Sequence, residues 1–111
     1  AFGNDALANN TTGGWNTAIG SAALFSNTTG TSNVGIGSGA LYSNTTGFSN
    51  TSIGNSSLGI NTTGDSNCAM GAFALSLNTT GANNTAIGSS TLSFNFTGSS
   101  NAGITLRLTW K

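Results

Sequence analysis

Residues 1–102 consist of six consecutive copies of one 17-residue unit, followed by nine residues of a different character. The copies begin at Ala1, Ala18, Gly35, Ser52, Ala69 and Ala86. Six of the seventeen positions carry one residue type in every copy: Gly at position 3, Leu at 7, Asn at 10, Thr at 12, Gly at 13 and Asn at 16. Such a fixed period predicts a repeat architecture in which each unit buries its apolar face against its neighbours.

The repeat length decides the fold class. A unit of 17 residues is too short for a helical hairpin, and Ser, Thr, Asn and Gly are poor helix formers. We therefore predict an all-β fold, a parallel β-solenoid (β-roll) with one 17-residue repeat per coil. Coils stacked about 4.8 Å apart give a rod about 29 Å long. The predicted division is a six-repeat solenoid over residues 1–102 and a C-terminal strand over 103–111.

Residues at the same position of successive coils form a column along such a rod. We expect short strands over 16–19 and 22–24, and corners at the glycines of positions 3 and 13. The asparagines of positions 10 and 16 suit corners too, and stacked asparagines can hydrogen-bond from coil to coil. Two columns are predicted to point inward as the core: position 2 (Phe2, Ile19, Ile36, Ile53, Met70, Ile87) and position 7 (Leu7, Leu24, Leu41, Leu58, Leu75, Leu92).

Composition excludes several functions. Only 4% of the residues are charged, and two cations balance two acids, which argues against nucleic acid and anionic membranes as partners. There is no apolar run long enough to insert into a membrane. His is absent, and Asp5 and Asp65 lie three or more coils apart, about 14 Å or further. We predict no enzyme activity, no metal and no cofactor. The single Cys68 is predicted to serve as a small inward or semi-buried side chain.

Large side chains outside the predicted core are candidates for contacts with a partner chain. Phe25 and Tyr42 occupy position 8, and Phe48 occupies position 14. The tail alternates apolar and polar residues, which is typical of a strand that caps the rod or is donated to the next subunit. The predicted subunit interface comprises Phe25, Tyr42, Phe48, Ile104, Leu106, Leu108 and Trp110. A carbohydrate platform of Trp15, Tyr42 and Phe48 is the alternative.

The Asn-Thr-Thr-Gly segments permit two further hypotheses. Every position-10 asparagine begins an Asn-x-Thr acceptor for N-glycans, although the same four residues also make a good turn. The candidate glycosylation sites are Asn10, Asn27, Asn44, Asn61, Asn78 and Asn95. The regular threonines of positions 11 and 12 suggest the hypothesis of an ice-binding face. Adjacent residues of a strand point to opposite sides, however, which argues against a single flat face.

Several segments resemble a known family. Asn16-Thr17-Ala18-Ile19-Gly20 and Asn84-Thr85-Ala86-Ile87-Gly88 are similar to the Asn-x-Ala-Ile-Gly repeats of YadA-type adhesin heads. The longer phrase NTAIGSxALxSNTTG resembles repeats of bacteriophage and bacterial tail-fibre-domain proteins. The resemblance covers nearly all of residues 1–102 and implies a left-handed parallel β-roll, often trimeric, with the Ile inward and the Gly at the turn.

The sequence thus predicts an extracellular structural fibre protein, located at a cell or virion surface, that homo-assembles into a filament or trimeric shaft with an adhesion or scaffolding role. Its partners would be copies of itself, with a cell-surface or glycan receptor as a further possibility. One alternative is a phage or viral tail-fibre segment that binds a receptor, and another is a carbohydrate- or ice-binding solenoid.

Overall fold

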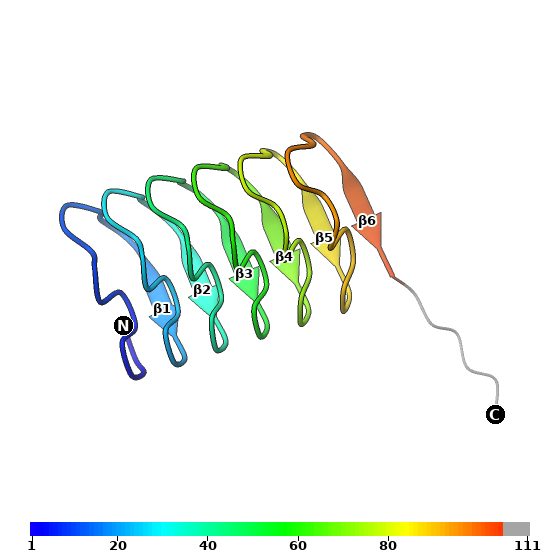
Figure 1. Cartoon of the computed structure of the whole chain (residues 1–111). Helices are drawn as coiled ribbons and strands as arrows, with labels where there is room; N and C mark the ends of the chain where they lie inside the picture. Colours follow the sequence, from blue (N-terminus) through cyan, green and yellow to red (C-terminus); the bar gives the residue numbers. More distant parts are fainter. Residues whose placement is uncertain (106–111) are drawn as a thin grey trace, which may run out of the picture.

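The computed structural model of the chain describes residues 1–105. Six three-residue strands, Thr17–Ile19 (β1), Val34–Ile36 (β2), Thr51–Ile53 (β3), Cys68–Met70 (β4), Thr85–Ile87 (β5) and Ala102–Ile104 (β6), form one parallel sheet in chain order. The described part of the chain contains no helix, and so none that could span a membrane. The predicted fold class is confirmed: the chain is an all-β parallel β-solenoid with one repeat per coil (Figure 1).

Each strand pairs with the next at an offset equal to the repeat length. Thr17 lies opposite Val34 in the first pairing, and Ile87 lies opposite Ile104 in the last. The Thr105 N–H donates to the Ile87 carbonyl at 2.9 Å, so this pairing runs past residue 102, where the repeat count placed a domain boundary. Because the offset is constant, every repeat position forms a column along the rod.

The predicted strand over 22–24 is wrong. Ala22 and Leu24 have φ angles of 55° and 53°, in the left-handed region, and positions 5 and 7 of the other coils share this conformation. The segment therefore curls instead of extending. Its backbone still bonds to both neighbouring coils: the Ala22 N–H donates to Asn4 O at 2.8 Å and the Leu24 N–H to Ala40 O at 2.9 Å. These bonds offset the roughly 1–2 kcal/mol that a left-handed residue other than glycine costs.

The core lies between the sheet and this curled segment. Leu24, Leu41, Leu58 and Leu75 of position 7 are fully buried, as predicted, each contributing about 1.5–3 kcal/mol. The end members of this column, Leu7 and Leu92, are partly buried against the same cluster. Small buried residues from positions 1 and 6 complete the core: Ala18, Ala23, Ala40, Ser52, Ala69, Ala74 and Ala86.

The prediction that the position-2 column belongs to the core is wrong. Successive residues of a strand point to opposite faces, and here the middle residue, position 1, points inward. The Leu column leaves space only for small side chains at position 1, where a Cβ added to Gly35 would already lie 3.3 Å from Leu24 Cγ. The position-2 side chains therefore point outward: Phe2 is 80% exposed, Ile36 is half-buried, and the others are 37–43% exposed, namely Ile19, Ile53, Met70 and Ile87.

Two columns of buried asparagine complete the interior. In the position-10 column, Asn61 Nδ2 donates to Asn44 Oδ1 and to Gly64 O, both at 2.9 Å. In the position-16 column, the Asn67 N–H donates to Asn50 Oδ1 at 3.0 Å. The same bonds recur from coil to coil, as predicted. Every buried side-chain nitrogen and oxygen of the described residues has a hydrogen-bond partner, so these polar columns do not leave unsatisfied groups in the core.

The position-3 glycines set how closely the coils approach. Gly54 has a φ of +133°, and a Cβ added there would lie 2.6 Å from the backbone carbonyl of Gly71 in the next coil. No side chain fits at such a distance, so a glycine in each coil is what permits this contact.

Candidate functional site

The outward surface of the sheet is a regular surface that runs along the rod. It carries the position-2 column beside that of position 17, which comprises Thr17, Val34, Thr51, Cys68, Thr85 and Ala102. We call these two columns the outer face. All its side chains are uncharged, and the partly exposed Ile and Met side chains form a continuous apolar stripe across β1–β6. A contiguous exposed apolar patch of this kind is typical of an interaction surface.

Sequence reasoning missed the outer face because it assigned the Ile column to the core. A signal was present at position 1, which holds only Ala, Gly or Ser in the coils that follow the first: Ala18, Gly35, Ser52, Ala69, Ala86 and Gly103. A column of small residues directly beside a column of Ile marks the side that packs tightly against the Leu column. The larger neighbour must then point away from the core.

The residues of the predicted subunit interface lie in separate columns. Phe25 and Tyr42 stack on each other within the chain, with ring centroids 5.1 Å apart and planes 6° from parallel. Phe48 is 48% exposed at position 14, and Ile104 lies at the end of the outer face. Leu106, Leu108 and Trp110, and with them the predicted cap or donated strand, lie outside the described residues. Contact of these side chains with a partner stays a prediction.

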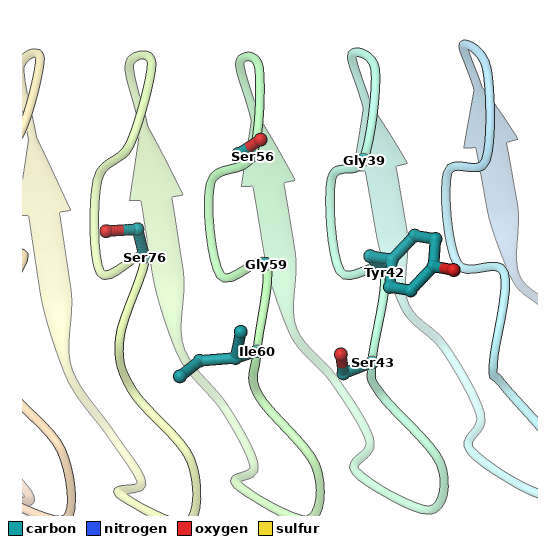
Figure 2. Close-up of a pocket in the computed structure, with 7 residues that line it drawn as sticks. All are labelled: Gly39, Tyr42, Ser43, Ser56, Gly59, Ile60 and Ser76. Atoms are coloured by element: carbon teal, nitrogen blue, oxygen red, sulfur yellow. The ribbon is translucent and has the colours of Figure 1, made fainter.

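The Phe25–Tyr42 column stops at a pocket. The next position-8 residue is Gly59, which has no side chain, and a pocket of about 410 Å³ opens there. Figure 2 shows Gly59 on the coil between those of Tyr42 and Ser76, with the Tyr42 ring leaning away from it. We call this pocket the notch; it is lined by Gly39, Tyr42, Ser43, Ser56, Gly59, Ile60 and Ser76.

The position-10 asparagines are not surface acceptors for glycans. Asn27, Asn44, Asn61 and Asn78 are fully buried, and the Nδ2 atom that would carry the sugar donates two hydrogen bonds inside the rod. At the ends, Asn10 and Asn95 are half-buried, and their Nδ2 atoms each donate to a glycine carbonyl at 2.9 Å. This geometry favours the turn interpretation over the glycosylation hypothesis, because the Asn-Thr-Thr-Gly segment is a turn held by its asparagine.

The two threonine columns differ in their hydrogen bonding. Thr28 and Thr62 of position 11 are half-buried, and their hydroxyls donate to the main-chain carbonyl of the equivalent threonine in the next coil, at 3.0 and 3.1 Å. The position-12 threonines are exposed: Thr12, Thr29, Thr46, Thr63, Thr80 and Thr97. The two columns therefore do not form the single array of equivalent hydroxyls that a two-column ice-binding face requires.

The acidic residues lie apart from each other. Asp5 belongs to the first coil, where Asn4 Nδ2 donates to its Oδ2 at 2.9 Å. Asp65 belongs to the fourth coil, and its Oδ1 accepts the Phe48 N–H of the third coil at 2.9 Å. Over residues 1–105, no three His, Cys, Asp or Glu side chains gather into a possible metal site. Cys68 is half-buried on the outer face.

Comparisons of the chain with protein-family models, with curated proteins and with solved structures found no match. We therefore argue function from the geometry and chemistry of the outer face and the notch.

Proposed function

We propose that the chain is a structural rod that associates with copies of itself through the outer face, as the subunit of an extracellular filament or fibre shaft at a cell or virion surface. The observation that carries the proposal is the exposure of Ile19, Ile53, Met70 and Ile87, which are 37–43% exposed in a single chain. Aliphatic side chains in an unbroken column gain stability when a second apolar surface covers them, at about 25 cal/mol for each Å² removed from water.

A second copy of the chain fits this surface better than an unrelated partner does. The column repeats along the sheet at about 4.8 Å, so the side chains of an identical column can pack between its members all along the rod. The outer face carries no charge to repel its own copy, and the whole chain has a net charge of zero. Self-association through one surface shared by all subunits is also the commonest way in which proteins form oligomers.

The core gives a physical reason for association. Within residues 1–105 only four leucines are fully buried, while the ordering of each backbone residue costs about 1–2 kcal/mol. Burial of the outer face would add an apolar layer on the opposite side of the sheet. We expect the associated rod to be considerably more stable than the single chain. A trimeric shaft is the arrangement implied by the resemblance to adhesin-head and tail-fibre repeats, and an adhesion or scaffolding role comes with it.

The test compares two lysine substitutions in the same coil. Ile53→Lys places a charge in the middle of the outer face, and Thr63→Lys places the same charge on an exposed position-12 residue away from it. We expect the unmodified chain and the Thr63→Lys variant to form oligomers in sedimentation velocity runs as concentration rises. The Ile53→Lys variant should remain a monomer with an unchanged far-ultraviolet circular dichroism spectrum.

Two results would overturn the proposal. Either the unmodified chain stays monomeric over the whole concentration series, or Ile53→Lys assembles as readily as Thr63→Lys. In the second case the copies meet through another surface, and the exposed Ile column has a different partner.

A further inference from the structure

Along the rod, the notch at Gly59 is wide enough for one missing ring. Coils are about 4.8 Å apart, so the coils of Tyr42 and Ser76 are separated by about 9.6 Å with only Gly59 between them. In the preceding step of the same column, Phe25 and Tyr42 place parallel rings 5.1 Å apart. One further ring therefore fits on the open side of Tyr42, at the level where the Gly59 side chain is absent.

The Tyr42 ring offers a face to such a ligand. One face is stacked on Phe25, and the residue nevertheless remains 42% exposed. Ile60, itself 40% exposed, adds an apolar wall from the next coil. The stack with Phe25 holds the tyrosine ring in place before any ligand binds, which reduces the entropy lost on binding.

The polar groups of the notch are neutral hydroxyls. Ser43, Ser56 and Ser76 line it, one from each of three successive coils, and the lining contains no charged residue. A hydroxyl both donates and accepts hydrogen bonds, which suits a ligand whose edge carries hydroxyls of its own. A nucleotide or another anion would find no charge there to balance its own, so the lining favours a neutral ligand.

We propose that the notch binds one hexopyranose unit of a neutral glycan. The C–H groups of one pyranose face would stack on the Tyr42 ring, and its equatorial hydroxyls would reach Ser43 and Ser56, whereas the Ser76 hydroxyl points away from Gly59 (Figure 2). A pocket with an apolar wall and a few convergent polar groups is the usual form of a small-molecule site. The notch shares no residue with the outer face, so this proposal does not rest on self-association, and the failure of either leaves the other standing.

The chain allows a sharp test because Tyr42 is its only tyrosine. Selective labelling of tyrosine gives one ring spin system in an NMR spectrum, and the probes are the methyl glycosides of glucose, galactose, mannose and N-acetylglucosamine. We expect at least one of them to shift the Tyr42 ring resonances saturably, with a dissociation constant on the order of 1–10 mM, as for a single stacked sugar. Saturation transfer should label one face of that sugar.

Substitution of Gly59 distinguishes the notch from other sugar contacts. Gly59→Phe would fill the missing level. Its Cβ would lie 3.0 Å from Ser56 O, so the turn must shift by a few tenths of an ångström, but the turn is of the kind that carries Tyr42 in the preceding coil: the Gly59 N–H donates to Ser56 O at 3.2 Å, as the Tyr42 N–H does to Gly39 O. We expect sugar binding to weaken at least tenfold, to beyond about 10–100 mM. Gly59→Ser is the matched control, because Ser76 and Ser93 occupy the same position, and it should bind within about threefold of the unmodified chain.

A second substitution protects the test against misfolding of the first. Tyr42→Ser removes the stacking face with a residue that position 8 already carries in two coils, and saturation transfer to the sugar should disappear. The proposal is wrong if none of the four glycosides perturbs Tyr42, or if binding survives in both Gly59→Phe and Tyr42→Ser. It is also wrong if indole shifts the ring saturably while no sugar does, because the notch would then be selective for an aromatic group.

Discussion

The position-7 and position-2 columns look alike in sequence and have opposite roles in the rod. One is Leu in every coil and the other is Ile or Met in coils two to six, yet Leu58 is fully buried while Ile53 is 37% exposed. Regular recurrence thus shows that a column is stacked along the rod. It does not show whether the side chains of that column point into the core or toward solvent. The side is decided by neighbouring residues, since adjacent strand positions point opposite ways.

The largest effect is expected in an inner polar column. Asn61→Asp replaces the Nδ2 that donates to Asn44 Oδ1 and Gly64 O, so an ionised carboxylate would face two acceptors in the core. We expect a loss of about 3–5 kcal/mol in the free energy of unfolding at neutral pH, measured by urea titration. The exposed Asn55→Asp is the control and should change this free energy by less than about 0.5 kcal/mol.

The same variant carries a pH signature. Burial and the two acceptors raise the pKa of the introduced carboxyl above its unfolded value of about 4, so the folded state binds more protons between the two values. Stability must then fall as pH rises through that window and recover as pH falls below it. The difference in the free energy of unfolding between Asn61→Asp and the unmodified chain should therefore shrink on acidification. If it does not, residue 61 is open to water.

The second effect concerns close contact between coils. Gly54→Ala would place a Cβ 2.6 Å from the Gly71 carbonyl at a φ of +133°, and we expect a loss of about 3 kcal/mol or more. Gly39→Ala is the control, because its φ is +66°, its nearest neighbour is Ser56 Oγ at 3.5 Å, and Ala22 occupies the same position in the preceding coil. Gly39→Ala should change the urea midpoint only slightly. An equal loss in the free energy of unfolding in both variants would contradict the close contact between Gly54 and Gly71.

The third test removes an inner leucine. Leu58→Ala leaves a cavity in the middle of the rod and should cost about 2–5 kcal/mol. Leu92→Ala, in the partly buried last member of the same column, should cost less. Urea titration of both variants below the concentration of association measures the difference, and an equal cost would mean that the end coil is as well covered as the middle.

The smallest effect is expected at the outer face. Ile53→Ala, measured in the same dissociated chain, should cost no more than about 1 kcal/mol, since the side chain is already partly in water. It should weaken association more than it weakens folding. A monomer loss as large as that of Leu58→Ala would place the Ile column inside and remove the contrast between the two columns.

The repeat pattern was sufficient to predict the solenoid, the 17-residue offset, the buried Leu column and the asparagine hydrogen bonds from coil to coil. It was insufficient for the curled segment, because Ala22 and Leu24 are residues for which left-handed φ is unusual, and only the bonds to Asn4 and Ala40 make that conformation favourable. Those bonds exist only once the coils have stacked.

The candidate sites were harder to predict for a related reason. The stack of Phe25 on Tyr42 and the gap at Gly59 depend on which residues of one column are neighbours along the rod. Position 8 varies from coil to coil, and although the sequence singled out Phe25 and Tyr42 as large side chains, it gave no indication that their rings stack or that a pocket opens at Gly59. Likewise, the Asn-x-Thr triplet gives no indication that its amide is enclosed, since one of the enclosing groups, Asn44 Oδ1 for Asn61, comes from a different coil.

The constant offset between coils also bears on how such a rod can change its length. Because Thr17 pairs with Val34 as Thr85 pairs with Ala102, each internal coil meets the same backbone arrangement above and below. Loss or duplication of 17 residues, as slippage in a repetitive coding sequence produces, would join equivalent positions and leave the remaining hydrogen-bond columns continuous. Length in this architecture can therefore be inherited in whole steps of about 4.8 Å, without the invention of any new contact.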